Sequence, residues 1–242
     1  MHYAEFTKQG ASHSKNDDYR SLPLEEDNTQ AKGYLFCVCD GVGGYPGGEI
    51  ASKLCCTKIH DDYYKYLKIQ DVDAWLKKEI SEINKLIQKK AKELNKPNMS
   101  STIVTLLLKN DKAYSYNCGD SRIYLFSSKE LKQITDDHSP VWQEFKQGLI
   151  SKEDIINDPR KNLINQALGF SSEPKINSNI ITLPKEFTFL LCTDGLTDFV
   201  KDIEIKNILC CNVGLEEKID KLYKKAIQNK SYDDISIILV SN

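Results

Sequence analysis

The chain has 242 residues, of which 40% are hydrophobic and 28% charged, with a formal net charge of −2 at pH 7. This composition is typical of a globular protein and excludes a global basic field that would attract nucleic acid or anionic lipid. No apolar segment reaches the roughly 18 residues of a membrane helix, and the start, MHYAEFTKQG, lacks the features of a signal peptide. We therefore expect a cytoplasmic protein without a membrane or nucleic-acid partner.

The first part of the chain is predicted to form short strands followed by two helices. Residues 1–7, 17–22 and 33–39 have the pattern of strands, and residues 49–68 have the composition of a helix. A second helix is marked more clearly, because apolar residues recur at three- and four-residue spacing from Val72 to Leu94. Asp71 can cap its first turn, and Pro97 lies just beyond its end.

The sequence pattern then changes from helical to β-rich, with four segments in close succession: STIVTLLLK, KAYSYNCG, SRIYLFS and ELKQIT. Asn110-Asp111 and Ser127-Ser128 mark two of the turns between them, which predicts antiparallel strands. Residues 136–165 are polar, with short helical pieces, one of which Ser151 can cap. The remaining predicted elements are strands over 178–183 and 187–193, helices over 203–210 and 215–228, and a strand over 235–240.

Strands occur in blocks along the chain, and so do helices. This order favours a layered α+β sandwich over a parallel, doubly wound sheet. No internal repeat, low-complexity tract or linker divides the sequence, so we expect one domain over residues 1–242.

The eight cysteines include Cys37 and Cys39 in a strand-like run and two adjacent pairs, 55–56 and 210–211, in helical patterns. No C-x-x-C spacing occurs, so zinc is not expected. We expect these cysteines to be small buried apolar residues in a reducing compartment.

Five aspartates at the ends of apolar runs are the most informative feature of the chain. Asp40 and Asp194 each precede a glycine and close YLFCVCD and FTFLLCTD, Asp120 closes AYSYNCGD, Asp18 lies in NDDY, and Asp233 opens DDISIILV. Gathering carboxylates at one rim costs repulsion and desolvation, and bound cations compensate for that cost. Hard oxygen ligands select Mg²⁺ or Mn²⁺. The pattern therefore predicts a metal-dependent hydrolase that acts on a phosphorylated group.

Five short motifs occur in an informative order: NDDY (16–19), DGVGGYPGGEIAS (40–52), NCGDSRIY (117–124), TDGLTD (193–198) and DDIS (233–236). Together they resemble the metal-dependent protein phosphatases, the type 2C serine/threonine phosphatase family, from about Phe6 to Val240. The segment over about 136–165 resembles the flap of bacterial single-domain members. The resemblance implies a four-layer α-β-β-α sandwich, in which two antiparallel sheets are flanked by helices.

The resemblance also implies which residues bind metal and carry the catalysis. Asp40 would bridge two ions, the Gly41 carbonyl would bind one of them, and Asp194 and Asp233 would hold the other. Asp18 would act nearby, largely through bound waters.

A third, weaker ion is implied by the bacterial relatives. Asp120 and Asp198 would hold it, with Asp194 shared. Asp194 and Asp198 are four residues apart, so one helical turn would place both carboxylates on one side.

The physical chemistry of such a site is direct hydrolysis. Two Mn²⁺ or Mg²⁺ ions ~3.5–4 Å apart can share a solvent molecule, lower its pKa toward neutrality and screen the phosphate charge. The hydroxide would attack phosphorus without a phosphoenzyme. Glycines at 41, 43, 44, 47 and 48 would let the backbone approach an ion or a phosphate closely.

Several assignments have alternatives in the sequence itself. Asp40 and Asp194 could end strands in ordinary turns, and Asp120 could bond within its own loop. Asp233 is chosen by its alignment with the family motif, and Asp234 is the alternative because the family usually has Asp-Asn before this last strand.

The chain departs from the family at the phosphate-binding position. Family members usually carry an arginine three residues after the glycine that corresponds to Gly10, where this chain has His13. A histidine can donate a hydrogen bond when neutral and adds charge when protonated. We expect His13 to bind the substrate phosphate, with Lys15 or Lys8 as alternatives and an exposed turn histidine as the rival interpretation.

Two further polar residues near the motifs have weaker signals. Arg122 is expected to pair with buried carboxylates rather than with substrate. His138 lies in the expected flap, which makes it a candidate for a role in substrate access.

The leading hypothesis is a monomeric serine/threonine protein phosphatase whose partners are phosphorylated proteins and a cytoplasmic serine/threonine kinase. A rival is a catalytically weak pseudophosphatase that serves as a regulatory binding module, which the missing arginine favours. A third hypothesis is a metal-dependent phosphatase for other phosphoesters, such as nucleotides.

Overall fold

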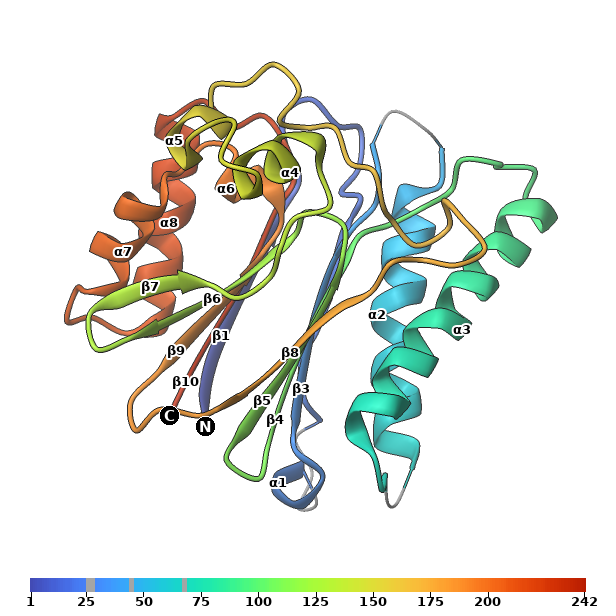
Figure 1. The fold of residues 1–242 in the computed structure, drawn as a ribbon, viewed down its shortest axis with the longest axis horizontal. Helices are drawn as coiled ribbons and strands as arrows, with labels where there is room; N and C mark the ends of the chain where they lie inside the picture. The colour runs from blue at the N-terminus through green and yellow to red at the C-terminus, as the bar shows by residue number, and fades with distance from the viewer. Residues whose placement is uncertain (25–28, 44–45, 67–68) are drawn as a thin grey trace.

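The computed structural model describes residues 1–24, 29–43, 46–66 and 69–242. Two five-stranded antiparallel sheets lie face to face, and helices cover the outer face of each (Figure 1). Helices α2 and α3 cover one sheet, while α7 and α8 cover the other (Figure 1). The four-layer α-β-β-α sandwich expected from the sequence is therefore confirmed.

The first sheet has the strand order β2-β3-β4-β5-β8. Its strands are β2 (Asp18–Ser21), β3 (Tyr34–Asp40), β4 (Ile103–Lys109), β5 (Lys112–Cys118) and β8 (Asn177–Thr182). The helices on it are α2 (Gly48–Lys65) and α3 (Val72–Glu93), and the short α1 (Thr29–Lys32) precedes β3.

The second sheet has the strand order β1-β10-β9-β6-β7, so the first and last strands of the chain are neighbours. Its strands are β1 (His2–Lys8), β10 (Ile235–Ser241), β9 (Thr188–Cys192), β6 (Arg122–Ser127) and β7 (Glu130–Gln133). The helices on this side are α6 (Asp194–Thr197), α7 (Asp202–Leu209) and α8 (Leu215–Gln228).

Strand β3 shows why the central strands are apolar on both faces. Leu35, Cys37 and Cys39 point toward the helical layer, whereas Phe36 and Val38 pack between the two sheets. Alternate residues of a strand point to opposite faces, and both faces are covered here. The strand that ends in Asp40 is thus fixed from both sides.

Helix α3 follows its sequence pattern closely. The Asp71 side chain accepts a hydrogen bond from the Ala74 backbone N–H at 3.0 Å and so caps the first turn. Leu76, Ile80 and Ile87 are among the residues of its buried stripe. Helix α2 ends at Lys65, and residues 67–68 of the longer predicted helix lie outside the described residues, as does Gly44.

Two turns of the hairpins can be compared with the sequence. Asn110 and Asp111 have positive φ angles of 49° and 58°, as the two central residues of a type I′ turn require. The second turn is centred on Ser128 and Lys129, with φ angles of 51° and 61°, rather than on Ser127-Ser128. Strand β6 ends at Ser127, where the predicted segment SRIYLFS also ends, so only the centre of the turn is shifted by one residue.

The segment between β7 and β8 contains the expected short helices. They are α4 (Pro140–Lys146) and α5 (Lys152–Ile155), and Ser151 caps α5 in a capping box with Asp154. In Figure 1 both lie above the sheets, at the same end as α6.

The prediction that all cysteines are buried is wrong for one pair. Cys210 and Cys211 are exposed, because they follow the last turn of α7, whereas the other six are buried. Within the ranges described, no helix combines the length and apolar character needed to cross a membrane.

Truncation of a residue in the buried stripe of α3 tests this packing. Ile80 is fully buried, whereas Ile203, on α7, is 57% exposed. We expect Ile80→Ala to lower the free energy of unfolding by about 2–5 kcal/mol, because it leaves a cavity. Ile203→Ala should change it by less than about 0.5 kcal/mol in the same urea titration. Equal effects of the two variants would contradict the observed core.

Candidate metal centre

The predicted aspartates meet where the ends of the two sheets come together. Asp18 begins β2 and lies directly opposite Asp40, the last residue of β3, in the first sheet. Asp194 begins the short helix after β9, and Asp233 lies two residues before β10 in the second sheet. The Asp40 carboxyl interacts with those of Asp194, Asp18, Asp233 and, more weakly, Asp120. Residues far apart in sequence thus form one acidic cluster.

The two Asp-Gly pairs allow the backbone to come this close. A Cβ at Gly195 would lie 1.9 Å from the Asp234 carbonyl oxygen, so only glycine lets the chain after Asp194 reach the start of β10. A Cβ at Gly41 would lie 2.3 Å from the Gly48 carbonyl carbon, at the start of α2. Larger residues here would push the carboxylates apart.

Thr193 ties the first sheet to the second beside these carboxylates. Its hydroxyl donates to Asp18 Oδ2 at 2.9 Å and accepts from the Ser236 backbone N–H at 3.0 Å. This side chain was not singled out in the sequence, although it precedes an Asp-Gly pair.

The second part of the cluster involves Asp120 and Asp198. One turn of α6 separates Asp194 from Asp198, and the Asp198 N–H donates to the Asp194 carbonyl at 2.8 Å. Asp120 is buried and interacts with Asp198. Lys161 lies 3.5 Å from the Asp198 carboxylate and donates to its backbone carbonyl at 2.8 Å, so it neutralises part of the charge.

Removal from water raises the pKa of every carboxyl group in the cluster, and mutual repulsion raises it further. The pKa of Asp18 rises to about 8 and that of Asp120 to about 7. Burial, and then the neighbouring aspartates, raise the pKa values of Asp40 and Asp194 well above the ordinary range. The cluster is therefore costly to ionise unless a cation is bound.

Unused oxygen atoms show that a divalent ion fits the cluster. Asp18 Oδ1 and Asp194 Oδ1 are buried without a hydrogen-bond partner. Such atoms cost free energy unless something satisfies them. An oxygen-rich, anionic site of this kind suits Mg²⁺ or Mn²⁺. The donor atoms and the charge both match what such an ion requires.

The structure distinguishes Asp233 from Asp234 by their surroundings. Asp234 is 3% exposed and accepts hydrogen bonds from the backbone N–H groups of Gly10 and Asp17, each at 2.7 Å, and from His13 Nδ1 at 2.9 Å. Asp233 instead interacts with Asp40 and is partly exposed. Asp234 therefore holds the N-terminal loop, and Asp233 faces the acidic cluster.

His13 lies at the edge of this cluster, between both of those aspartates. Its Nε2 is 3.6 Å from Asp233 Oδ1, while Nδ1 is bonded to Asp234. Burial lowers the pKa of His13, but the carboxylates of Asp234 and Asp233 outweigh this and raise it above the usual value. The Asp234 contact was not foreseen, because Asp234 is 221 positions away in sequence.

The two lysines weighed against His13 are placed differently. Lys15 pairs with Glu49 at the start of α2 and is 53% exposed. The ammonium of Lys8 lies 5.0 Å from the centre of the Tyr223 ring, on the outer helix α8. His13 is thus the candidate that directly contacts the acidic cluster.

Arg122 and His138 support the loop that carries Asp120. Arg122 Nε donates to Asp137 Oδ2 at 2.9 Å, and Nη1 donates to the Tyr124 hydroxyl at 3.1 Å. His138 is buried, and its Nδ1 accepts from the Gly119 N–H at 3.1 Å. Burial also lowers the pKa of His138, which suits an accepting nitrogen. Both side chains therefore have structural partners, as expected for Arg122.

Comparison with known proteins identifies close relatives of this fold and sequence. Residues 1–144 match the family described as Protein phosphatase 2C. The chain is 34% identical to the serine/threonine phosphatase stp of Listeria welshimeri, over 98% of this chain and 95% of that protein. It is 27% identical to the protein phosphatase PhpP of Streptococcus pneumoniae, over 100% and 97%. The crystal structure of serine/threonine phosphatase Stp1 from Staphylococcus aureus superposes with a TM-score of 0.92 at 31% identity, covering 99% of this chain and 94% of that one.

The raised pKa of Asp18 predicts a pH-dependent cost to stability. A carboxyl group whose folded-state pKa exceeds its unfolded value destabilises the fold progressively as the pH rises between the two values. In EDTA, Asp18→Asn should therefore be more stable than the wild type, and the difference should grow from pH 5 to pH 8. At pH 8 we expect the free energy of unfolding of the variant to exceed that of the wild type by more than about 1.4 kcal/mol, the equivalent of one pKa unit.

Urea denaturation at several pH values measures this difference. Saturating Mn²⁺ provides the control, because an ion that compensates the carboxylates should remove the advantage of the variant. A stability difference that does not change with pH would show that burial does not raise the pKa of the Asp18 carboxyl group.

Proposed function

The chain belongs to the protein phosphatase 2C family, and from that premise we propose that its acidic cluster holds the divalent ions with which it dephosphorylates proteins. It is a metal-dependent protein serine/threonine phosphatase, and its substrates are proteins that carry phosphorylated serine or threonine. The observation that carries the proposal is the buried carboxylate oxygens of Asp18 and Asp194, which have no hydrogen-bond partner.

Five positions form the proposed two-ion site. Asp40 would be shared by both ions, the Gly41 carbonyl would help hold one of them, Asp194 and Asp233 would hold the other, and Asp18 would act largely through water. The mutual interactions of these carboxylates and their raised pKa values support this assignment. We propose Mn²⁺ or Mg²⁺ as the ion, since all the donors are oxygen atoms.

Asp120 and Asp198, with Asp194 shared, are proposed to hold a third and weaker ion. Their carboxyl groups repel one another, which favours a cation between them. The Lys161 ammonium, 3.5 Å from Asp198, already supplies part of the compensating charge. A third ion would have to compete with that contact, which explains why its affinity would be lower.

The ions would supply Lewis acidity, which lowers the pKa of water and offsets the negative charge of the phosphate. The residues of the chain fix the positions where this happens. Asp40, Asp194 and Asp233 act as catalytic residues through the ions they bind. His13 is proposed to contact the phosphate, and Asp234 acts as its positioning residue. The bond to His13 Nδ1 turns Nε2 toward Asp233 and the acidic cluster.

The segment over 136–165 is proposed to act as the flap that borders substrate access, within a single phosphatase domain over residues 1–242. Arg160 Nη1 pairs with Glu144 at 2.8 Å, which joins the segment after α5 back to α4. Lys161 connects the same segment to Asp198 of the acidic cluster. A shift of the flap would therefore move Lys161 relative to Asp198 and change the charge beside the proposed third ion.

We further propose a cytoplasmic, monomeric enzyme that opposes a serine/threonine kinase. All eight cysteines are free thiols, as expected in a reducing compartment. The regulatory module and the phosphatase for other phosphoesters are not favoured, because the relatives described above are named as serine/threonine or protein phosphatases.

Hydrolysis of a phosphothreonine peptide tests the proposed metal site. We expect activity with Mn²⁺, loss of activity with EDTA, and a decrease in kcat/KM of at least about 100-fold for Asp194→Asn, since each lost factor of ten corresponds to ~1.4 kcal/mol of transition-state stabilisation. The matched control is Asp220→Asn, because Asp220 is exposed on α8 and pairs with Lys224 across one helical turn.

Two outcomes would count against this assignment. Equal losses in both variants would point to a general effect of the substitutions. Undiminished activity of Asp194→Asn would remove Asp194 from the site.

Substitution of His13 tests the proposed phosphate contact. A hydrogen bond to a charged group contributes roughly 1.5–3 kcal/mol, so His13→Ala should lower kcat/KM by about 10- to 100-fold, mainly by raising KM. His2→Ala is the control, because His2 is an exposed histidine at the start of β1. An unchanged KM and kcat in His13→Ala would defeat the assignment.

A further inference from the structure

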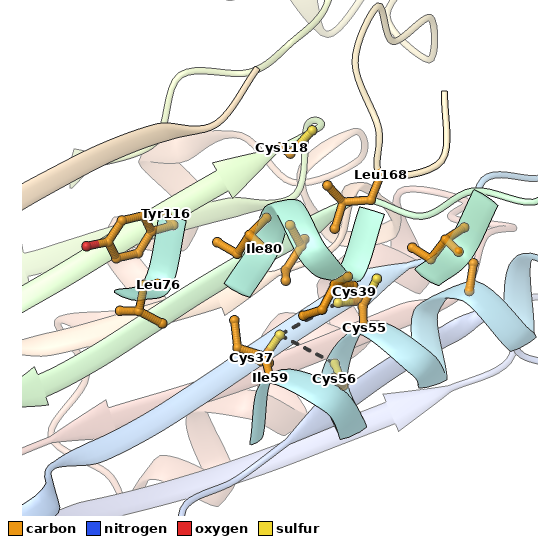
Figure 2. Close-up of a cluster of buried hydrophobic side chains, with 14 of the residues drawn as sticks. Cys37, Cys39, Cys55, Cys56, Ile59, Leu76, Ile80, Tyr116, Cys118 and Leu168 are labelled. Atoms are coloured by element: carbon orange, nitrogen blue, oxygen red, sulfur yellow. Dashed lines mark hydrogen bonds between the residues drawn. The ribbon is translucent and has the colours of Figure 1, made fainter. Parts of the chain in front are cut away.

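Four cysteines gather in the layer between β3 and α2. Cys37 and Cys39 are two residues apart and therefore share one face of the strand, while Cys55 and Cys56 are adjacent on the helix. All four are fully buried. Figure 2 shows the two pairs facing each other, with Cys37 between Cys39 and Cys56. We call these four residues the thiol cluster.

The sulfur atoms of the thiol cluster are closely spaced. Cys37 Sγ lies 3.6 Å from Cys39 Sγ and 3.5 Å from Cys56 Sγ, and these three sulfurs all lie within 4.8 Å of one another. Cys55 interacts with Cys39 but lies outside that group of three, so as a fourth ligand it would have to move closer to the other sulfurs. Two thiolates bound to one tetrahedral zinc ion at ~2.3 Å would be about 3.8 Å apart. The two printed spacings from Cys37 are thus within a few tenths of an ångström of a shared-ion geometry, and Cys39 and Cys56 lie within 4.8 Å of each other.

We propose that Cys37, Cys39 and Cys56, with Cys55 as the fourth ligand, bind one thiophilic metal ion such as Zn²⁺, Cd²⁺ or Cu⁺. Soft sulfur ligands favour such ions, whereas the carboxylates of the metal centre favour hard ones, so the two sites would have different metal preferences. Each thiol that becomes a ligand releases its proton to solvent as the ion binds.

The surroundings of the cluster suit this role. The Thr105 hydroxyl lies 3.7 Å from Cys37 Sγ and can donate to it, which favours a thiolate there. Cys56 Sγ lies 3.4 Å from the Tyr19 carbonyl oxygen, the acceptor for its thiol proton when no ion is bound. Simple packing of small apolar side chains would not require the sulfurs to face one another. Cys192, which is also buried, lies in the other sheet.

An ion in the thiol cluster would stabilise the first sheet next to Asp40 and Gly41 of the proposed metal site. Cys39 directly precedes Asp40, and Cys56 belongs to the helix that begins against Gly41. Coordination would therefore join β3 to α2 next to a proposed ligand of the catalytic ions. Because the ion would bind the assembled cluster more tightly than the cysteines of the unfolded chain, it would raise the melting temperature.

The test uses the full chain carrying Cys210→Ser and Cys211→Ser, which removes the exposed thiols that could also bind metal. This chain is unfolded and refolded without oxygen in excess Mg²⁺, with Zn²⁺, Cd²⁺ or Cu⁺ added in separate samples, and then desalted. Refolding is needed because the cluster has no exposed sulfur. We expect one retained ion per chain by elemental analysis and, for Cd²⁺, a near-ultraviolet sulfur-to-metal absorption band.

Matched variants separate the cluster from other thiols. Cys56→Ala should lose the retained ion and the absorption band, whereas Cys192→Ala, at a buried position outside the cluster, should keep both. Retention of the ion by Cys56→Ala with an unchanged band would overturn the proposal.

X-ray absorption on the refolded zinc-loaded chain gives a second measurement that does not depend on a variant. Three or four sulfur ligands at about 2.3 Å would support the site. Oxygen and nitrogen ligands alone would overturn it. Failure of every added ion to remain bound would also overturn it and leave packing as the role of these cysteines.

Discussion

The electrostatic cost of placing several carboxylates together at the junction of two sheets is the constraint on which the rest of the structure depends. Asp18 and Asp40 come from one sheet, and Asp194 and Asp233 from the other, so their approach is fixed by how the sheets pack. Burial and repulsion raise their pKa values, and a divalent cation is the natural compensation. In a phosphatase that uses metal ions, the packing of the two sheets therefore determines how strongly the site attracts a cation.

The scaffold maintains this costly arrangement by rigid attachment at several points. Strand β3 is packed on both faces, and glycine at position 195 allows the chain after Asp194 to touch the start of β10. Thr193 bonds to Asp18 in the other sheet. Residues placed on strand ends by such contacts keep their geometry when charge is present, which is what binding and orienting a phosphate requires.

The contacts of Asp234 accommodate the departure from the family pattern at positions 13 and 234. The Asp234 carboxylate accepts two hydrogen bonds from backbone N–H groups of the N-terminal loop and one from His13. It therefore holds both the loop and the histidine in place. Where family members usually have an arginine and an asparagine, this chain has His13 and Asp234. When protonated, His13 presents a donating Nε2 beside the acidic cluster, although its side chain is shorter than that of arginine and its charge depends on pH.

Much of the fold could be predicted because periodic patterns act locally. The apolar stripe of α3, its Asp71 cap and the alternation of strands all follow from nearby residues. The exposure of Cys210 and Cys211 was missed, because a helical pattern does not show where the last turn becomes open to solvent.

The meeting of the aspartates was predictable from motifs, but the contacts that support them were not. Lys161 beside Asp198 and His13 beside Asp234 join positions that only the fold brings together. The convergence of Cys37, Cys39, Cys55 and Cys56 could not be predicted for the same reason, since one pair has strand spacing, the other is adjacent on a helix, and neither has a zinc-binding motif.

Anomalous diffraction from crystals grown with Mn²⁺ tests the central claim most directly, because it locates the ions themselves. The account predicts two manganese peaks ~3.5–4 Å apart, with Asp40 between them and Asp194 and Asp233 on one of them. No peak among these carboxylates, or a single peak held by His13 and Asp234 instead, would contradict it.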